Sequence, residues 1–259
     1  MNATYIQNSI AQLKTDIFMD VRHRTLQKYT GEPVLDENQL FCLLLPFLNE
    51  EEWQQEQKEA AITVGIVYAA LAAHDHIKEL DATSKDQQLT VLAGDFYSGR
   101  YYEILAASGN VALIRSLSQG IVARCEHQIK VYEQEGRTVE QWFAAVENIE
   151  AGLIAQFFEL YAFEPYIALI EKGLLLFRLE REWATYQSGQ KSLLTRCVEK
   201  SAIVEGTTYE SVMQHKMEQL KATFLQDIEW ASFLQQDIKQ ALQARVEANV
   251  ASTNGIRGV

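Results

Sequence analysis

Apolar residues recur at steps of three and four along almost the whole chain, and no stretch shows a convincing period of two. This spacing gathers apolar side chains on one face of a helix. One such stripe covers residues 113–132, and another covers 213–242. The pattern therefore predicts an all-α fold in which long helices pack one face inward.

Breaker residues divide this pattern into segments. Turns that contain glycine or proline recur at 31–33, 108–110, 136–137, 164–165, 188–189 and 206, and helices usually end at such sites. The expected helices cover 3–29, 36–47, 50–80, 85–107, 110–135, 138–162, 165–187 and 208–250. The segment 190–204 has a weaker helical pattern, and the tail 251–259 is expected to be frayed.

Polar residues mark several of the expected helix starts. An Asn, Ser or Thr followed three residues later by Glu or Gln can form a capping box, in which each side chain binds the other residue's backbone N–H. Three pairs have this spacing: Asn49 with Glu52, Thr138 with Gln141, and Thr207 with Glu210. Pro165 suits the first turn of a helix, where its missing N–H is not needed.

Length and composition favour one compact unit. The chain has 259 residues, of which 47% are apolar, enough to fill a sizeable core. No linker or shift in composition divides it, so we expect a single helical domain over 1–259, with 1–30 as a candidate N-terminal helical arm. The net charge of −12 and the lack of a dense Lys/Arg stripe argue against a nucleic-acid partner, since that affinity needs clustered basic side chains.

Cysteine usage and hydropathy bear on the compartment. Cys42, Cys125 and Cys197 lie far apart and lack the paired spacing of metal ligands, and no secretory signal precedes the first expected helix. The cytoplasm is therefore the expected location. The apolar run 60–73 is shorter than the roughly 20 residues that cross a bilayer, which predicts a buried helix. Peripheral contact with a membrane stays open, although no basic amphipathic segment favours it.

The first polar cluster that could carry chemistry is 74–79, at the end of the most apolar segment. Asp75 and Glu79 are four residues apart, so they share a helix face and could hold a hard cation through carboxylate oxygens. His74 and His76 point to different sides and make a poor metal pair. The alternative, which the spacing alone favours, is a solvated polar helix end.

The second cluster, 92–105, carries Gly94 and Gly99 inside an expected helix. Each interior glycine weakens a helix by about 1 kcal/mol, which indicates that another backbone or a ligand comes close. Ordinary core packing, with Asp95 bonded to a neighbour, is the alternative explanation. On the sequence of this segment alone, ordinary core packing is the favoured explanation.

The third cluster, 176–186, pairs Arg178 with Glu182, and Arg181 with Thr185, at a spacing of four residues. This pattern is typical of an exposed helix face with salt bridges. The chain shows no Ser-His-Asp order, no glycine-rich phosphate loop and no zinc-ligand spacing. By itself the third cluster indicates no function.

Taken in order, the three clusters resemble the motifs of the trans-prenyltransferase family. That family carries His-Asp-Asp-x-x-Asp, then Gly-Asp-Tyr-x-x-x-Arg/Ala-x-x-x-Leu, then Phe-Gln-x-x-Asp-Asp-x-x-Asp on successive helices. The resemblance runs from about residue 35 to 250 and implies an isoprenoid-synthase-like helical bundle. In the family, the two acidic motifs face each other and hold magnesium ions, which stabilise charge on the departing diphosphate of an allylic substrate.

The chain departs from the family at the metal-binding positions. Half of the six carboxylates remain, because a histidine stands in the first acidic motif and an arginine and a threonine stand in the second. The degenerate metal-motif positions are Asp75, His76, Glu79, Arg181, Glu182 and Thr185. The resemblance therefore leads us to assign no metal site to this chain.

Basic groups that would bind diphosphate are also missing. Glu150-Ala151 stands where the family has Lys-Thr, and the Gly-Lys-x-x-Arg-Pro segment has no counterpart among residues 34–57. Between His74 and Gly94 the chain is about ten residues shorter than the family pattern, and the Arg-Arg-Gly loop is absent. Joint loss of metal ligands and diphosphate-binding cations indicates a pseudoenzyme without catalytic residues.

Within this family, the segment Leu-Ala-Gly-Asp-Phe-Tyr-Ser-Gly-Arg-Tyr-Tyr at 92–102 is most similar to the component 1 group of heptaprenyl diphosphate synthases. That resemblance implies an accessory subunit that binds no cofactor alone. Its partner would be a catalytic subunit with intact acidic motifs, which binds Mg²⁺ and takes farnesyl and isopentenyl diphosphate. The heterodimer would make an all-trans chain of seven isoprene units for the menaquinone side chain, and the accessory subunit would help to set its length.

The same resemblance implies where the partner binds, because homodimeric relatives associate through the Gly-Asp helix and the helix after it. The implied interface residues are Gly94, Asp95, Ser98, Gly99, Tyr101, Tyr102, Leu113, Leu117 and Ile121. Two other functions stay open. One is a divergent prenyltransferase or terpene synthase that is active alone through Asp75, Glu79 and Glu182. The other is a purely structural helical interaction protein.

Overall fold

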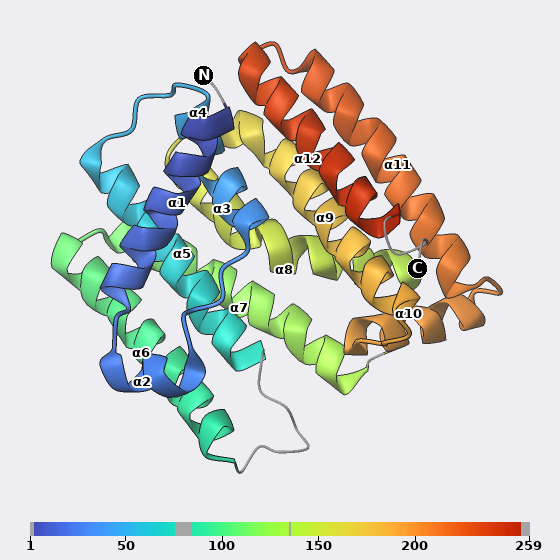
Figure 1. The fold of residues 1–259 in the computed structure, drawn as a ribbon, viewed down its shortest axis with the longest axis horizontal. Helices are drawn as coiled ribbons and strands as arrows, with labels where there is room; N and C mark the ends of the chain where they lie inside the picture. Colours follow the sequence, from blue (N-terminus) through green and yellow to red (C-terminus); the bar gives the residue numbers. More distant parts are fainter. Residues whose placement is uncertain (1–2, 76–83, 135, 255–259) are drawn as a thin grey trace. The chain divides into compact units, whose positions relative to one another are not determined.

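The computed structural model describes residues 3–75, 84–134 and 136–254, and these contain helices and no strand (Figure 1). The all-α prediction is therefore confirmed. The helices are α1 (Ala3–Asp20), α2 (Arg24–Thr30), α3 (Glu37–Leu43), α4 (Leu45–Leu48), α5 (Gln55–Asp75), α6 (Lys85–Ser108), α7 (Val111–Glu133), α8 (Val139–Leu160), the 3-10 helix η2 (Glu164–Tyr166), α9 (Ile167–Gln187), α10 (Leu193–Val204), α11 (Tyr209–Trp230) and α12 (Gln236–Asn254).

The contacts within the chain form two compact units. Unit 1 comprises residues 1–118 and 159–162, and unit 2 comprises 119–158 and 163–259. The single domain over 1–259 stays a prediction, and each unit is described by itself. The proposed N-terminal arm lies in unit 1, where α1 packs against α3 and α5 and buries Ile10 and Ile17.

Helix α5 forms the core of unit 1. Every residue from Thr63 to Ala70 is buried, as expected of a helix that is apolar on all sides. α1 and α6 pack against it. Gly65 allows the close approach of α1, because a Cβ at this position would collide with the side chain of Ile17. Among the described helices, none combines the length and apolarity needed to cross a membrane.

Unit 2 has an aromatic core on α8 and α9. Trp142, on α8, is fully buried, and its indole N–H donates a 3.0 Å hydrogen bond to the hydroxyl of Ser201 on α10. α9 packs against α11 and α12. Gly173 permits the contact with α11, since a Cβ there would lie only 2.8 Å from the ring of Phe224. α11 contacts both α9 and α10.

Two of the expected long helices are interrupted. The helix expected over 3–29 ends at Asp20, and α2 begins after His23, whose extended backbone and Nδ1 atom cap the N–H of Leu26 at 3.2 Å. The helix expected over 208–250 breaks at Ala231, where ψ of 88° leaves the helical region. Neither break contains glycine or proline, so the breaker rule did not find them.

Two further boundaries differ. The helix expected over 36–47 divides at Leu44, and Pro46 lies in the first turn of α4, where its missing N–H is tolerated. The helix expected to start at 50 begins at Gln55, because Glu50 has φ of 68° and cannot lie inside a helix. The weaker segment 190–204 does form a helix, α10, from Leu193 onward.

One of the three predicted capping boxes is confirmed in full. The N–H of Gln141 donates to Thr138 Oγ1 at 3.2 Å, and the N–H of Thr138 donates to Gln141 Oε1 at 2.9 Å. The box at Thr207 is wrong by one residue, because Thr208 caps α11 by accepting from the N–H of Ser211.

The box at Asn49 is wrong because this residue follows α4, and α5 starts only at Gln55. The predicted first-turn proline is confirmed, since Pro165 lies in the first turn of η2.

Replacing Thr138 with alanine should lower the free energy of unfolding by about 1 kcal/mol, because it removes an N-cap acceptor and leaves the N–H of Gln141 without its side-chain partner. Urea unfolding followed by circular dichroism measures this loss. Thr207→Ala is the matched control and should change stability little, since Thr208 rather than Thr207 caps α11. Equal losses in the two variants would contradict the capping assignment.

Candidate functional site

A cluster of charged side chains joins α8 and α9 in unit 2. The Nη1 atom of Arg178 donates to Glu150 Oε1 at 2.6 Å. Its Nε and Nη2 atoms donate to Glu182 Oε1 at 3.0 and 2.8 Å. Glu150 and Glu182 are only 4% and 7% exposed. One guanidinium therefore bridges two buried carboxylates from two helices.

The second oxygen of Glu182 is also occupied. Ser192 Oγ donates to Glu182 Oε2 at 2.6 Å, and Thr195 Oγ1 donates to the same oxygen at 3.3 Å. Ser192 is at the same time the N-cap of α10, where it accepts from the N–H of Thr195 at 3.0 Å. The cap thus ties α10 to the charged cluster. We call the set Arg178, Glu150, Glu182, Arg181, Ser192 and Thr195 the Arg178 network.

Charge is balanced within the Arg178 network. Burial alone would lower the pKa of Arg178, but the carboxylates of Glu150 and Glu182 outweigh it and raise that pKa above its usual value. Arg181 approaches Glu150 Oε2 at 3.5 Å from a side chain that is 47% exposed. Burial lowers the pKa of Arg181, and the charge of Glu182 offsets part of that effect. Two guanidinium groups therefore face two carboxylates.

This arrangement does not fit a magnesium ion held by Glu150 and Glu182. Mg²⁺ needs carboxylate oxygens with free lone pairs and an octahedral shell. Here the guanidinium of Arg178 already lies between the two carboxylates, and hydroxyl donors take the remaining oxygen of Glu182. Across the described residues, no group of three or more His, Cys, Asp or Glu side chains is placed to hold a metal ion. The network is built to hold three helices together.

The sequence predicted part of this site. The pairing of Arg178 with Glu182 is confirmed, but the interpretation as an exposed face is wrong because α8 and α10 cover the carboxylates. Thr185 is not bonded to the Arg181 side chain, since its hydroxyl donates to the backbone carbonyl of Arg181 at 2.9 Å.

Ser192 and Thr195 were missed as members of the site. The available signal was a serine directly before an apolar helical run, which marks an N-cap.

The first acidic segment lies at the end of α5 in unit 1. Asp75 is the last residue of α5, whereas His76 and Glu79 lie outside the described residues. The imidazole of His74 lies against Gly94 on α6, where a Cβ would come within 2.6 Å of Nε2. The same Nε2 is 3.7 Å from Asp95 Oδ1. The group that comes close at Gly94 is thus a histidine side chain of the same chain, with Asp95 beside it, and not another backbone, as the packing explanation expects.

The predicted interface residues differ in their exposure. Gly94, Tyr101, Leu113 and Leu117 are buried within the chain. Ser98 and Ile121 are half-buried. Asp95, Gly99 and Tyr102 are exposed and recur at helical spacing along one face of α6, where nothing lies within 4 Å of a Cβ built on Gly99. We call this exposed set the α6 face. Its contact with another chain stays a prediction. The buried residues of the predicted interface cannot touch another chain directly, and they can only stabilise the helices that carry the exposed residues.

Solved structures with a similar fold include prenyl diphosphate synthases. A decaprenyl diphosphate synthase from Rhodobacter capsulatus has a TM-score of 0.70 at 12% identity, and the match covers 97% of this chain and 98% of that one. A heptaprenyl diphosphate synthase from Staphylococcus aureus has a TM-score of 0.65 at 12% identity and covers 98% of each chain. At this identity the likeness concerns the fold alone, and it confirms the isoprenoid-synthase-like bundle.

Sequence similarity is more specific. Heptaprenyl diphosphate synthase component 1 from Geobacillus stearothermophilus is 36% identical over 124 residues, which are 48% of this chain and 56% of that protein. The match thus spans little more than half of the relative. A family model described as heptaprenyl diphosphate synthase (HEPPP synthase) subunit 1 matches residues 23–229, which include both the α6 face and the Arg178 network. The chain therefore belongs to the subunit 1 family of heptaprenyl diphosphate synthases.

Proposed function

We propose that the chain is a non-catalytic subunit that activates a separate catalytic prenyl diphosphate synthase subunit. The observation that carries this proposal is the Arg178 network. Its carboxylates Glu150 and Glu182 are bonded to a guanidinium of the same chain, so they are not free to hold the cations that would stabilise a departing diphosphate. A chain with this network activates the catalytic subunit by contacts of its surface and not by binding cations for the reaction.

The proposed partner has both acidic motifs intact and holds the magnesium ions. It takes farnesyl and isopentenyl diphosphate and makes an all-trans chain of seven isoprene units. The word heptaprenyl in the family description supports the seven units, whereas the substrates and the all-trans geometry rest on the resemblance alone. The menaquinone side chain as destination follows from the same resemblance, and the cytoplasm as location follows from the scattered cysteines. In the complex, the accessory chain stabilises the active geometry of its partner and influences where elongation stops.

The proposal is tested by supplying the purified chain with farnesyl diphosphate, isopentenyl diphosphate and Mg²⁺, alone and together with a catalytic subunit. The chain alone should give no elongated product. Mixing the two proteins should raise turnover by about tenfold or more, equivalent to at least 1.4 kcal/mol in the barrier. Separation of the products by chain length shows whether seven units are made. Efficient turnover by the single chain would overturn the proposal.

A variant separates an accessory role from residual catalysis. Asp75→Ala removes the described carboxylate of the first acidic segment. It should leave activation of the partner within about twofold, a difference of less than 0.5 kcal/mol. A loss of several orders of magnitude would instead indicate that Asp75 binds metal during turnover, and that the chain is itself an enzyme.

A further inference from the structure

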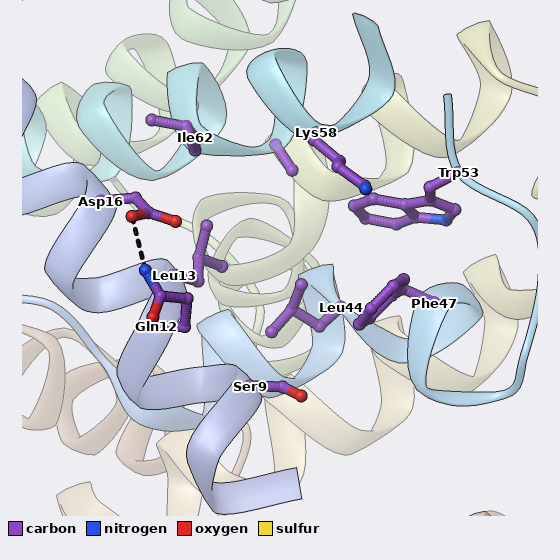
Figure 2. A pocket seen from close by; sticks show the side chains of 10 residues that line it. Ser9, Gln12, Leu13, Asp16, Leu44, Phe47, Trp53, Lys58 and Ile62 are labelled. Carbon is purple, nitrogen blue, oxygen red and sulfur yellow. Dashed lines mark hydrogen bonds between the residues drawn. The ribbon is translucent and has the colours of Figure 1, made fainter. Parts of the chain in front are cut away.

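Unit 1 contains an apolar pocket that the Arg178 network and the α6 face do not involve. It opens between α1, the segment around α4, and the first half of α5 (Figure 2). Its volume is about 210 Å³. The lining residues are Ser9, Gln12, Leu13, Asp16, Leu44, Phe47, Trp53, Lys58, Ala61 and Ile62.

The walls of this pocket are hydrocarbon and aromatic. Leu13, Leu44 and Ala61 are buried lining residues. Phe47 and Trp53 lie together at one end, with ring centroids 5.7 Å apart, as Figure 2 shows. Aromatic and aliphatic walls of this kind bind apolar groups by removing them from water.

Local structure explains why Trp53 lies here. Glu50 has a positive φ, so the chain leaves α4 in a turn instead of continuing as a helix. The N–H of Gln54 is then bonded to the side chain of Gln57 at 2.6 Å, which fixes the start of α5. Trp53 is held between these two points.

Polar groups are few and carry opposite charges. The carboxylate of Asp16 accepts a 2.8 Å hydrogen bond from the amide of Gln12 on the same helix. Lys58 is an exposed lining residue. One cation and one anion give the pocket little preference for the charge of a ligand, so recognition rests on its apolar walls.

The volume sets the size of an occupant. A dry cavity of about 150 Å³ holds one benzene molecule. By the same ratio, a pocket of about 210 Å³ accepts an apolar group of about eight carbon atoms. This is too small for a complete long prenyl chain and suits one branched five-carbon unit with part of the next, the rest of the molecule lying at the opening.

We propose that this pocket binds a short branched hydrocarbon segment of the isoprenoid class, without selecting for its head group. The choice of isoprenoid over other hydrocarbons rests on the proposed function, which places prenyl chains in the complex. The binding of a hydrocarbon group does not rest on the proposed function, since the pocket lies within unit 1. The pocket would hold one segment of a prenyl chain on the accessory subunit.

The test titrates the whole purified chain with geraniol, a ten-carbon isoprenoid alcohol, by isothermal calorimetry. Geraniol should bind saturably with a stoichiometry of one, and geranyl diphosphate should bind within about threefold of it, since 1.4 kcal/mol is needed for a tenfold difference. Inorganic diphosphate should not compete. Lys58→Gln should leave both affinities within the same range. Competition by diphosphate, or loss of geranyl diphosphate binding in Lys58→Gln, would mean that the head group is recognised and would overturn the proposal.

Two variants fill the pocket from opposite walls. Ser9→Trp on α1 and Ile62→Trp on α5 should each lower geraniol affinity by about tenfold or more, or 1.4 kcal/mol. Asn8→Trp is the matched control, because Asn8 is exposed and does not line the pocket. Equal loss in Asn8→Trp, or no saturable binding to the unchanged chain, would overturn the proposal.

Other outcomes separate this proposal from the accessory role. If geraniol does not bind but Ser9→Trp prevents association with the catalytic subunit, the pocket holds a side chain of that partner and the proposal fails. If geraniol binds but the chain does not activate any catalytic subunit, the proposed function fails and the pocket proposal survives. The two ideas can therefore be rejected independently.

Discussion

Replacing Arg178 with methionine should lower the free energy of unfolding by about 3 kcal/mol, because removing one partner of a buried ion pair leaves the other charge uncompensated. The side chain of methionine is apolar and of similar length, so the variant removes charge rather than bulk. Both carboxylates that lose their cation, Glu150 and Glu182, are almost completely buried. Urea unfolding of the purified chain, followed by circular dichroism, measures the loss.

Companion variants show whether the loss comes from buried charge. In the Arg178→Met background, changing both Glu150 and Glu182 to Gln should recover much of the stability, because neutral amides are cheaper to bury than carboxylates. Arg178→Lys should be intermediate, since an ammonium cannot reproduce the three donors that reach two carboxylates.

A surface pair provides the reference for these variants. Lys191 and Glu199 form an ion pair at 2.7 Å between partly exposed side chains. Lys191→Met should cost about 1 kcal/mol or less, as is usual for exposed ion pairs. A similar cost for Arg178→Met would contradict the structural role of the Arg178 network.

Magnesium gives a second readout of the same network. Arg178→Met leaves Glu150 and Glu182 as neighbouring carboxylates with only the guanidinium of Arg181, 3.5 Å from Glu150, beside them. A divalent ion that binds only the folded state raises its stability. Added Mg²⁺ should therefore raise the thermal unfolding midpoint of Arg178→Met more than that of the unchanged chain. An equal response in the two proteins would contradict the idea that the guanidinium takes the place of a cation between these carboxylates.

The sequence predicted helices well where breaker residues interrupt the apolar stripe. Gly109 and Gly189 both have a left-handed φ, of 66° and 84°, at the ends of α6 and α9, a conformation that glycine adopts without strain. The breaks at His23 and Ala231 were missed because the apolar spacing continues across them. Ala231 and Leu234 remain buried within the turn itself, so apolar periodicity alone cannot reveal the change of direction.

The charged site was predictable only in part, for a related reason. Arg178 and Glu182 are neighbours on one helix, and their spacing of four residues indicates the pair directly. Glu150 is 28 residues away from Arg178, and their contact depends on which faces of α8 and α9 meet. Helical periodicity gives the face of each helix but not its neighbour. The same spacing therefore suggested an exposed pair, whereas the packing of α8 and α10 buries both carboxylates.

A glycine in the α6 face distinguishes stability of the chain from assembly. Gly99 lies inside α6, is exposed, and has nothing within 4 Å of a Cβ built on it. Gly99→Arg should therefore raise the stability of the isolated chain by several tenths of a kcal/mol to about 1 kcal/mol, because arginine is a much better helix former than glycine. Thermal unfolding of the purified chain checks this gain.

The same variant should reduce activation of a catalytic subunit by about 30-fold or more, since a bulky charge without a partner costs at least about 2 kcal/mol when an interface buries it. Ala244→Arg, on an exposed position of α12, is the matched control and should leave activation unchanged. Gain of stability together with loss of activation is the combination that a partner contact requires, because no contact among the described residues explains a glycine there. If Gly99→Arg activates the partner normally, the α6 face is not the interface, and the absence of a side chain at this position has another origin.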